Sequence, residues 1–285
     1  PMTSDATFSP NCDSSLIGAH KIKAVVNDGY ESQEIEWDVE VNYFSDECNN
    51  LDAGEICTLV GRLGSGSGLL NTHDDLRIEP NHIEPYPGGG YFFSSMNMHG
   101  VWFYNDTNAE ITVLGKAVAS KTLTRLFGQD TQGSGVDGSK YTSYYFNSPR
   151  GMAYSSFDNS LYVADYYNNK VVKFDSTGAG SKFAGNWNGG NTDGETRTSH
   201  RCRRPHNIVV DDNEKKVFVA CSEVSSGNDG TIKYFMMDSD EGYTLVRYGG
   251  SYVQGAIGYS NSARTRRAYS LTKDPTRKIL YSGDL

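Results

Sequence analysis

Four polar side chains of different types share one equivalent position in a line of sequence that recurs along the chain. The line runs over 80–95, 149–165 and 205–221, where it starts with proline, and over 268–284, where it starts with alanine. The residues directly after these starts are Asn81, Arg150, His206 and Tyr269. If the position were only structural, one residue type would serve every copy. Four different hydrogen-bonding side chains therefore favour a rim that holds a polar ligand; a solvated position that drifts freely is the alternative.

Two clusters of arginine stand just before the third and fourth copies of the line in an otherwise acidic chain. They are Arg201, Arg203 and Arg204, and Arg264, Arg266 and Arg267. If the copies superpose, the two clusters adjoin and form a positive patch on one face. Guanidinium groups match carboxylates geometrically, so the patch could receive a carboxylate or an acidic glycan. Ion pairs with Asp and Glu of the same face are the alternative.

Histidine and aspartate show no spacing typical of a metal site. Of the six histidines, only His82 and His206 are expected near the inner strand of a repeat, and they occupy different positions in it. A catalytic zinc ion usually takes three protein ligands. Asp130, Asp137 and Asp193 lie in glycine-rich loops without the dense carboxylate spacing of a calcium loop, and turn formation explains them better. We therefore predict no metal and no cofactor.

Nucleophile and phosphate-binding motifs are also missing from the sequence. The GSGSG stretch at 64–68 has no strand-to-helix context for a nucleophile elbow. It also lacks the Lys-Ser/Thr ending of a phosphate loop. No catalytic residue is predicted.

At most two bridges can form within this chain from its five cysteines, which are Cys12, Cys48, Cys57, Cys202 and Cys221. Cys48 and Cys57 bracket a polar loop that a disulfide could close. Cys202 and Cys221 flank neighbouring strands and could also pair. Buried free thiols are the alternative, and the pattern leans mildly toward an oxidising compartment.

The bulk composition excludes some partners. A formal net charge of −9 argues against binding a nucleic-acid backbone. No run of about 18 apolar residues is present, so we expect no membrane insertion in this segment, and the polar start is not a signal peptide. The 31 glycines and 19 tyrosines favour strands joined by tight turns.

We expect each repeat that contains the recurring line to form four short strands. We expect each repeat to begin with a strand that ends in glycine, as at 57–61, 125–128, 182–185 and 247–250. A glycine-rich loop, an apolar inner strand, a turn and two further strands follow. The starts at 80, 149, 205 and 268 are 69, 56 and 63 residues apart, which predicts enlarged loops leading into each inner strand. Such repeats are typical of β-propeller blades.

Two further sets of residues are expected to be structural. The first set lies one residue after the position of Asn81, Arg150, His206 and Tyr269. It consists of His82, Gly151, Asn207 and Ser270, where glycine and asparagine suggest a positive φ. The aromatic residues Tyr144–Phe146, Tyr166–Tyr167 and Phe157 are expected to pack between blades, with the Tyr166–Tyr167 pair partly exposed. An exposed tyrosine pair is a good binding anchor; the alternative is that one of the two tyrosines covers the neighbouring blade.

Residues 147–175, NSPRGMAYSSFDNSLYVADYYNNKVVKFD, resemble the NHL-repeat family of β-propellers. The resemblance covers 54–285, is strongest in the second copy and is weak in the fourth. It implies a partial propeller of about three and a half blades, and six blades are common in this family. We therefore expect the remaining blades of the same polypeptide to complete the ring. Some members are enzymes, including amidating lyases that hold zinc through channel histidines.

The first part of the chain has a clean period of two. Ile22, Ala24 and Val26 share one face of an expected strand, and Ile35, Trp37, Val39 and Val41 share one face of the next. This stretch resembles the closing hairpin of bacterial immunoglobulin-like modules. The expected division is an immunoglobulin-like fragment at 1–46, a linker at 47–55 and propeller blades at 56–285.

Together these features predict an all-β, non-enzymatic recognition or scaffold segment of a larger secreted or surface protein. We expect it to bind protein or carbohydrate through the propeller face. The alternative is a propeller enzyme, a metal-dependent lyase or a lactonase-like hydrolase, with its site at the central channel.

Overall fold

The computed structural model describes residues 18–27, 32–41, 80–186, 194–222, 230–247, 268–274, 276 and 279–284. The chain divides into two compact units, Pro1–Leu59 and Val60–Leu285. Within the described ranges the regular elements are strands and short 3-10 helices, which confirms the all-β class. None of those ranges holds a helix of the length and apolarity needed to cross a membrane.

The described part of the first unit is one antiparallel hairpin of β1 (Gly18–Asn27) and β2 (Ser32–Val41). The register pairs Ile22 with Trp37 and Ala24 with Ile35, so the two apolar faces predicted from the period of two coincide. Because a single hairpin is common to many β folds, the immunoglobulin-like assignment stays a prediction.

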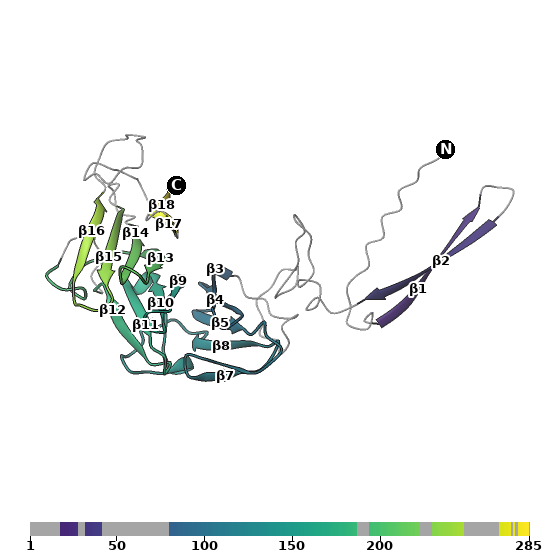
Figure 1. Cartoon of the computed structure of the whole chain (residues 1–285), viewed down its shortest axis with the longest axis horizontal. Helices are drawn as coiled ribbons and strands as arrows, with labels where there is room; N and C mark the ends of the chain where they lie inside the picture. The colour runs from purple at the N-terminus through teal and green to yellow at the C-terminus, as the bar shows by residue number, and fades with distance from the viewer. Residues whose placement is uncertain are drawn as a thin grey trace. The chain divides into compact units, whose positions relative to one another are not determined.

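The second unit is a series of four antiparallel sheets, which we call blades one to four (Figure 1). Blade one is β3 (Pro80–Pro85), β4 (Tyr91–Ser95), β5 (Gly100–Tyr104) and β8 (Leu123–Gly128). Blade two is β9 (Pro149–Ser155), β10 (Ser160–Asp165), β11 (Lys170–Phe174) and β12 (Gly180–Ala184). Blade three is β13 (Pro205–Asp211), β14 (Lys216–Cys221), β15 (Thr231–Met236) and β16 (Gly242–Arg247). Blade four consists of β17 (Ala268–Lys273) and β18 (Leu280–Asp284).

The first strands of successive blades lie side by side, β3 next to β9, β9 next to β13, and β13 next to β17. This places the four copies of the recurring line on the inner side of the series, as Figure 1 shows. Three complete blades and two strands of a fourth confirm the predicted partial propeller.

Two details of the predicted repeat are wrong. The strand that ends in glycine closes the preceding blade instead of opening the next, since β8 pairs with β5 and places Gly128 opposite Gly100. The extra length of the first repeat is also not confined to the loop before β9. Part of it forms a separate hairpin of β6 (Ile111–Val113) and β7 (Lys116–Val118), inserted between the third and fourth strands of blade one.

Aromatic side chains fill the space between blades one and two. The rings of Phe127 and Phe174 stack with centroids 3.8 Å apart, and Tyr144 and Phe146 are fully buried beside them, as predicted. Phe157 does not join the core: its side chain is 43% exposed, because it lies in the turn between β9 and β10. Burying each large ring contributes roughly 1.5–3 kcal/mol.

The closest approach of two inner strands explains Gly151. A Cβ atom there would lie 2.5 Å from Cα of Asn207 and 2.7 Å from the carbonyl oxygen of His206. The predicted positive φ is wrong for this residue and for its equivalents His82, Asn207 and Ser270. Glycine is needed at this position so that β9 and β13 can pack backbone against backbone.

Candidate functional site

Each of the four predicted rim residues lies in a β-bulge at the start of its inner strand. In blade one, Pro80 pairs with Ser95 and His82 with Ser94, so Asn81 has no partner in the ladder. The same shift leaves His206 and Tyr269 unpaired in blades three and four. In blade two, Arg150 and Gly151 lie between the paired residues Pro149 and Met152. A bulge re-aims a side chain away from the regular alternation of the strand, which makes these positions equivalent in structure as well as in sequence.

Arg150 and His206 come into direct contact although they belong to different blades. Nη1 of Arg150 lies 2.8 Å from Nδ1 and 2.9 Å from Nε2 of His206. Because a guanidinium group only donates hydrogen bonds, His206 must accept one through an unprotonated ring nitrogen. Burial, together with the charges of Arg150 and Arg204, lowers the pKa of His206 to about 3. The imidazole is therefore neutral at physiological pH.

Among the described residues, the side chains that contact the guanidinium group of Arg150 are neutral. It lies 3.8 Å from the ring centroid of Tyr166, and Nη2 donates to Sδ of Met96 at 3.3 Å. Nε of Arg150 is buried and has no acceptor among the described residues. None of the ion pairs formed between described residues includes Arg150. A partly buried cation without a counter-ion is energetically unfavourable unless a ligand supplies one.

The two outer members of the predicted set extend this contact chain. Asn81 is exposed, and its Oδ1 accepts a hydrogen bond of 2.9 Å from the backbone N–H of Met96. The ring of Tyr269 meets the ring of His206 edge to face at 4.2 Å. All four predicted residues thus lie along one end of the inner strands, with Asn81 connected to Arg150 through Met96.

A second arginine approaches the same tyrosine pair. The guanidinium carbon of Arg204 lies 5.7 Å from the ring centroid of Tyr166 and 5.5 Å from that of Tyr167. These tyrosines form the 3-10 helix η4 (Tyr166–Asn168) directly after β10. Tyr166 is buried and Tyr167 is 49% exposed. We call the eight residues of this cluster the rim: Asn81, Met96, Arg150, Tyr166, Tyr167, Arg204, His206 and Tyr269.

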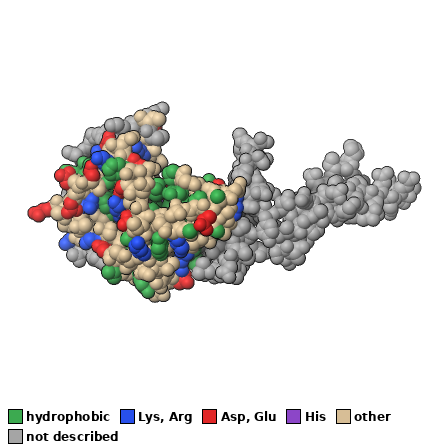
Figure 2. Space-filling view, turned by 60° about the horizontal axis from the view of Figure 1, so that its bottom comes forward, with side chains coloured by type: hydrophobic (Ala, Val, Ile, Leu, Met, Phe, Trp, Pro, Cys, Tyr) green, Lys and Arg blue, Asp and Glu red, His purple; other side chains and the backbone are tan. Residues whose placement is uncertain are grey.

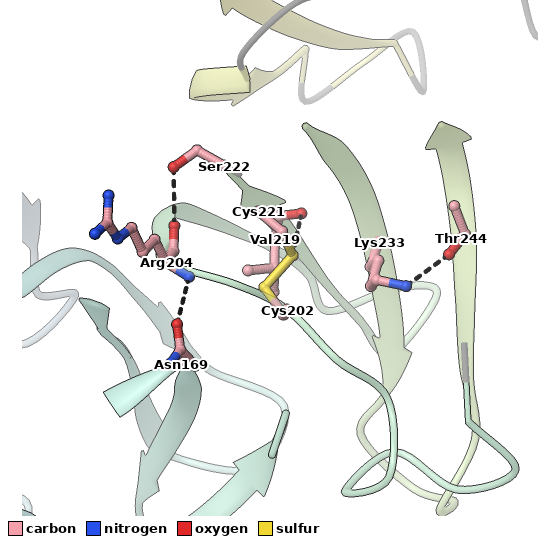
Figure 3. The surroundings of a disulfide bond; sticks show 8 residues. All are labelled: Asn169, Cys202, Arg204, Val219, Cys221, Ser222, Lys233 and Thr244. Atoms are coloured by element: carbon pink, nitrogen blue, oxygen red, sulfur yellow. Dashed lines mark hydrogen bonds between the residues drawn. A yellow bond between two sulfur atoms is a disulfide. The ribbon is translucent and has the colours of Figure 1, made fainter. Parts of the chain in front are cut away.

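Backbone hydrogen bonds hold Arg204 at the junction of blades two and three (Figure 3). Its N–H donates to Oδ1 of Asn169 at 2.9 Å, and its carbonyl oxygen accepts hydrogen bonds from both the N–H and the Oγ–H of Ser222, each at 3.3 Å. Figure 3 draws the bond from Oγ. His99 corresponds to Asn169 one blade earlier, where its Nδ1 accepts the N–H of Ser148 at 3.0 Å. The residues before Pro149 and Pro205 are therefore tied to the preceding blade.

Cys202 and Cys221 form a disulfide, one of the two pairings considered from the sequence (Figure 3). The register pairs Pro205 with Cys221 in blade three and Pro149 with Asp165 in blade two. Asp165 is thus the equivalent of Cys221, and its Oδ1 accepts the N–H of Asn147 at 2.8 Å. A covalent bond in one blade and a hydrogen bond in the other hold the incoming segment against the second strand. Cys12, Cys48 and Cys57 lie outside the described residues.

The other predicted basic residues have different surroundings. Arg201 and Arg203 are partly buried next to Cys202. Arg264, Arg266 and Arg267 lie outside the described residues, so the predicted joining of the two clusters stays a prediction.

The candidate metal ligands are spread over separate places. His82 lies 3.8 Å from Glu84 and not beside His206, and His200 is buried against the ring of Phe235. Asp130 pairs with Arg125 at 2.9 Å, and Asp137 accepts the N–H of Lys182 at 2.8 Å. In the part of the chain that the structure describes, no three His, Cys, Asp or Glu side chains are grouped to hold a metal ion. Asp193 lies outside that part.

Sequence reasoning did not predict that Met96 and Tyr166 contact the guanidinium group of Arg150. Tyr166 directly follows the last residue of β10 and Met96 directly follows the last residue of β4, so the repeat alignment gives them equivalent positions. That alignment is the signal that could have identified them. The residues that flank Met96 and Tyr166 in the sequence do not indicate that both side chains would face Arg150 from two different blades.

Acidification is expected to destabilise the protein through His206. Because its folded-state pKa is far below the ordinary value of 6.5, the unfolded chain binds the extra proton between pH 6.5 and 3. This residue alone is expected to lower the free energy of unfolding by on the order of 1–2 kcal/mol from pH 7.5 to pH 5. Urea unfolding of wild type and His206→Gln at both pH values measures the difference. A His206→Gln protein with an unchanged pH dependence would contradict it.

The comparisons with known proteins agree with the repeat seen in blade two. The model of the NHL repeat matches residues 146–174, which include β9, β10 and β11. No protein of curated function matches the chain.

Several solved structures are similar in fold. A protein from Bacteroides thetaiotaomicron described as an auxiliary nutrient binding protein is 21% identical, with 51% of this chain and 35% of that chain covered and a TM-score of 0.38. A gluconolactonase from Xanthomonas campestris is 9% identical, with 72% and 69% covered and a TM-score of 0.42. An inactive virginiamycin B lyase from Staphylococcus aureus is 14% identical, with 73% and 57% covered and a TM-score of 0.39. The chain spans 29% to 47% of the length of five similar Bacteroides proteins.

Proposed function

We propose that this chain, a partial β-propeller containing an NHL repeat, is a non-enzymatic recognition segment that binds carbohydrate or protein through the rim. In this proposal it belongs to a larger extracytoplasmic bacterial protein, which is secreted, periplasmic or at the cell surface. An immunoglobulin-like module at 1–46 and a linker at 47–55 precede the NHL-type blades at 56–285.

The observation that carries the proposal is the environment of Arg150. Its guanidinium group is held in place by the ring of Tyr166, by Sδ of Met96 and by His206, none of which carries a negative charge. Such a group is ordered before any ligand arrives, which reduces the entropy cost of binding. On the face shown in Figure 2, acidic and basic side chains are mixed.

The chemistry of His206 favours recognition over acid–base catalysis. A general base works best when its pKa lies near the working pH. The pKa of His206 is lowered to about 3 by burial and by two arginines, so it is a weak base at neutral pH. A neutral imidazole keeps the ability to accept or donate one hydrogen bond at the rim.

The Cys202–Cys221 disulfide supports the proposed location outside the cytoplasm. Disulfides form and persist in oxidising compartments, and cytosolic thiols are kept reduced. The bond is also close to Arg204 and thus contributes to the shape of the rim.

Binding screens with the full chain test the proposal. Wild type, Arg150→Met and Lys215→Met are screened against an array of oligosaccharides and against surface and secreted proteins of bacteria. Lys215→Met is the charge-matched control, because Lys215 pairs with Asp238 in an exposed ion pair at 2.9 Å outside the rim. We expect a ligand that is lost with Arg150→Met and kept with Lys215→Met.

Two results would contradict the proposal. One is a ligand that all three proteins bind equally well, since the rim would then not be the site. The other is a ligand that wild type converts into a product, since this would establish the enzyme alternative.

A further inference from the structure

Two guanidinium groups converge on one tyrosine ring in the rim. Arg150 lies 3.8 Å and Arg204 lies 5.7 Å from the ring centroid of Tyr166. Neither arginine forms an ion pair with a carboxylate of the described residues. Two like charges beside one ring repel each other, and an anion between them would remove that repulsion.

The hydrogen-bonding capacity of Arg150 is mostly unused within the described residues. A guanidinium group has five N–H donors. Arg150 directs Nη1 toward His206 and Nη2 toward a thioether sulfur, which is a weak acceptor. Each of these two nitrogens carries a second N–H, whereas Nε is buried. A carboxylate accepts two parallel N–H bonds from such a group, and these charge-assisted bonds are about twice as strong as neutral ones.

Tyr167 adds an apolar surface next to the charges. Its ring is 49% exposed, meets Tyr166 edge to face at 4.7 Å and lies 5.5 Å from the guanidinium carbon of Arg204. Tyrosine provides a rigid contact area with an apolar face and a polar tip. Asn81 and Tyr269 extend the row of polar groups along the inner strands.

We propose that the rim binds an acidic oligosaccharide, with a sugar carboxylate held between Arg150 and Arg204 and the sugar ring against Tyr167. This rests on the proposed recognition function and specifies its ligand class. We favour a saccharide because the exposed ring face of Tyr167 lies beside the donors of Arg204, an arrangement that suits a sugar ring and its hydroxyl groups. Arginine, methionine and tyrosine are also common in protein interfaces, so an acidic peptide is the competing ligand in the test.

A calorimetric titration of the full chain with three probes tests the ligand class. The probes are a galacturonate trimer, its fully methyl-esterified form and a glutamate peptide of the same charge. We expect the trimer to bind, the ester to bind at least about tenfold more weakly and the peptide to bind more weakly than the trimer. Binding of the trimer is expected to weaken with added salt.

Four variants locate the site. Arg150→Met and Arg204→Met are each expected to reduce the affinity for the trimer about tenfold or more. Arg150→Lys keeps the charge but loses the planar pair of donors, so we expect an intermediate loss. Lys215→Met removes one positive charge outside the rim and is expected to leave the affinity unchanged. Circular dichroism and urea unfolding verify that each variant is folded.

The outcomes separate this inference from the function on which it rests. Equal affinity for the trimer and its ester would overturn the carboxylate site and leave saccharide recognition intact. Tighter binding of the glutamate peptide would overturn the saccharide assignment. If none of the three probes binds, the inference is wrong. The recognition function is then tested by the broader screens, where an empty result would overturn it as well.

Discussion

Replacing Lys170 with methionine is expected to lower the free energy of unfolding by roughly 3–5 kcal/mol, because it leaves the buried carboxylate of Asp165 without its cation. Lys170 and Asp165 are 1% and 0% exposed, and Nζ lies 3.8 Å from Oδ2. Nζ also donates to Oη of Tyr144 at 3.0 Å and to Oγ of Ser134 at 3.2 Å. Asp165 in turn holds Asn147, two residues before Pro149, so the loss would reach the start of β9.

The stability lost in Lys170→Met is expected to depend on pH through the carboxyl group of Asp165. Burial raises the pKa of Asp165 to about 7 although the charge of Lys170 acts in the opposite direction. Without Lys170 the pKa rises further, so the folded state binds a proton that the unfolded chain releases above pH 4. Stability contributed by the protonated group is therefore lost as the pH rises. We expect the Lys170→Met protein to be closer to wild type at pH 5.5 than at pH 8.

The double variant Lys170→Met/Asp165→Asn is the matched control. Asparagine keeps an oxygen that accepts the N–H of Asn147 and removes the unpaired charge, so most of the lost stability is expected to return. Urea unfolding of wild type, the single variant and the double variant measures this. If the double variant is as unstable as Lys170→Met, the contribution of Lys170 comes from its hydrogen bonds and packing and not from the ion pair.

Removing the Cys202–Cys221 disulfide is expected to lower the free energy of unfolding by about 3 kcal/mol. The bond joins residues with a sequence separation of 19, and both cysteines are fully buried. A cross-link of this loop length restricts the unfolded chain. In the folded state it also holds the segment before Pro205 against the end of β14, where the carbonyl oxygen of Arg204 accepts the N–H of Ser222.

The variant Cys202→Ala/Cys221→Ala tests this effect in the absence of reductant. Urea unfolding gives the change in stability, and hydrogen exchange shows whether the amides of 201–206 and 219–222 open more often. A reducing agent added to the alanine variant controls for effects on other thiols and is expected to change nothing at this site. An unfolding midpoint equal to that of wild type would contradict the prediction.

The arrangement within each blade was predictable because it depends on local patterns. Alternation of apolar residues and turn-forming glycine and asparagine is repeated in every copy, so aligning the copies identified the inner strands and the common position of Asn81, Arg150, His206 and Tyr269. The order of strands at the blade boundary was misread, since the strand ending in Gly128 looks the same whether it opens or closes a blade. Phe157 was misplaced because its sequence neighbourhood does not show that it lies in an exposed turn.

The repeat, the β class and the common position of Asn81, Arg150, His206 and Tyr269 follow from the sequence alone, because each is encoded in residues close together along the chain. The contact of Arg150 in blade two with His206 in blade three becomes visible only in the folded protein. The same holds for the contacts of Met96 and Tyr166 with the guanidinium group. These contacts depend on the distance and rotation between blades, which the stacking of Phe127 on Phe174 and the close approach at Gly151 determine. A neutral His206 beside two arginines without carboxylate partners in the described chain is therefore a property of the packed blades.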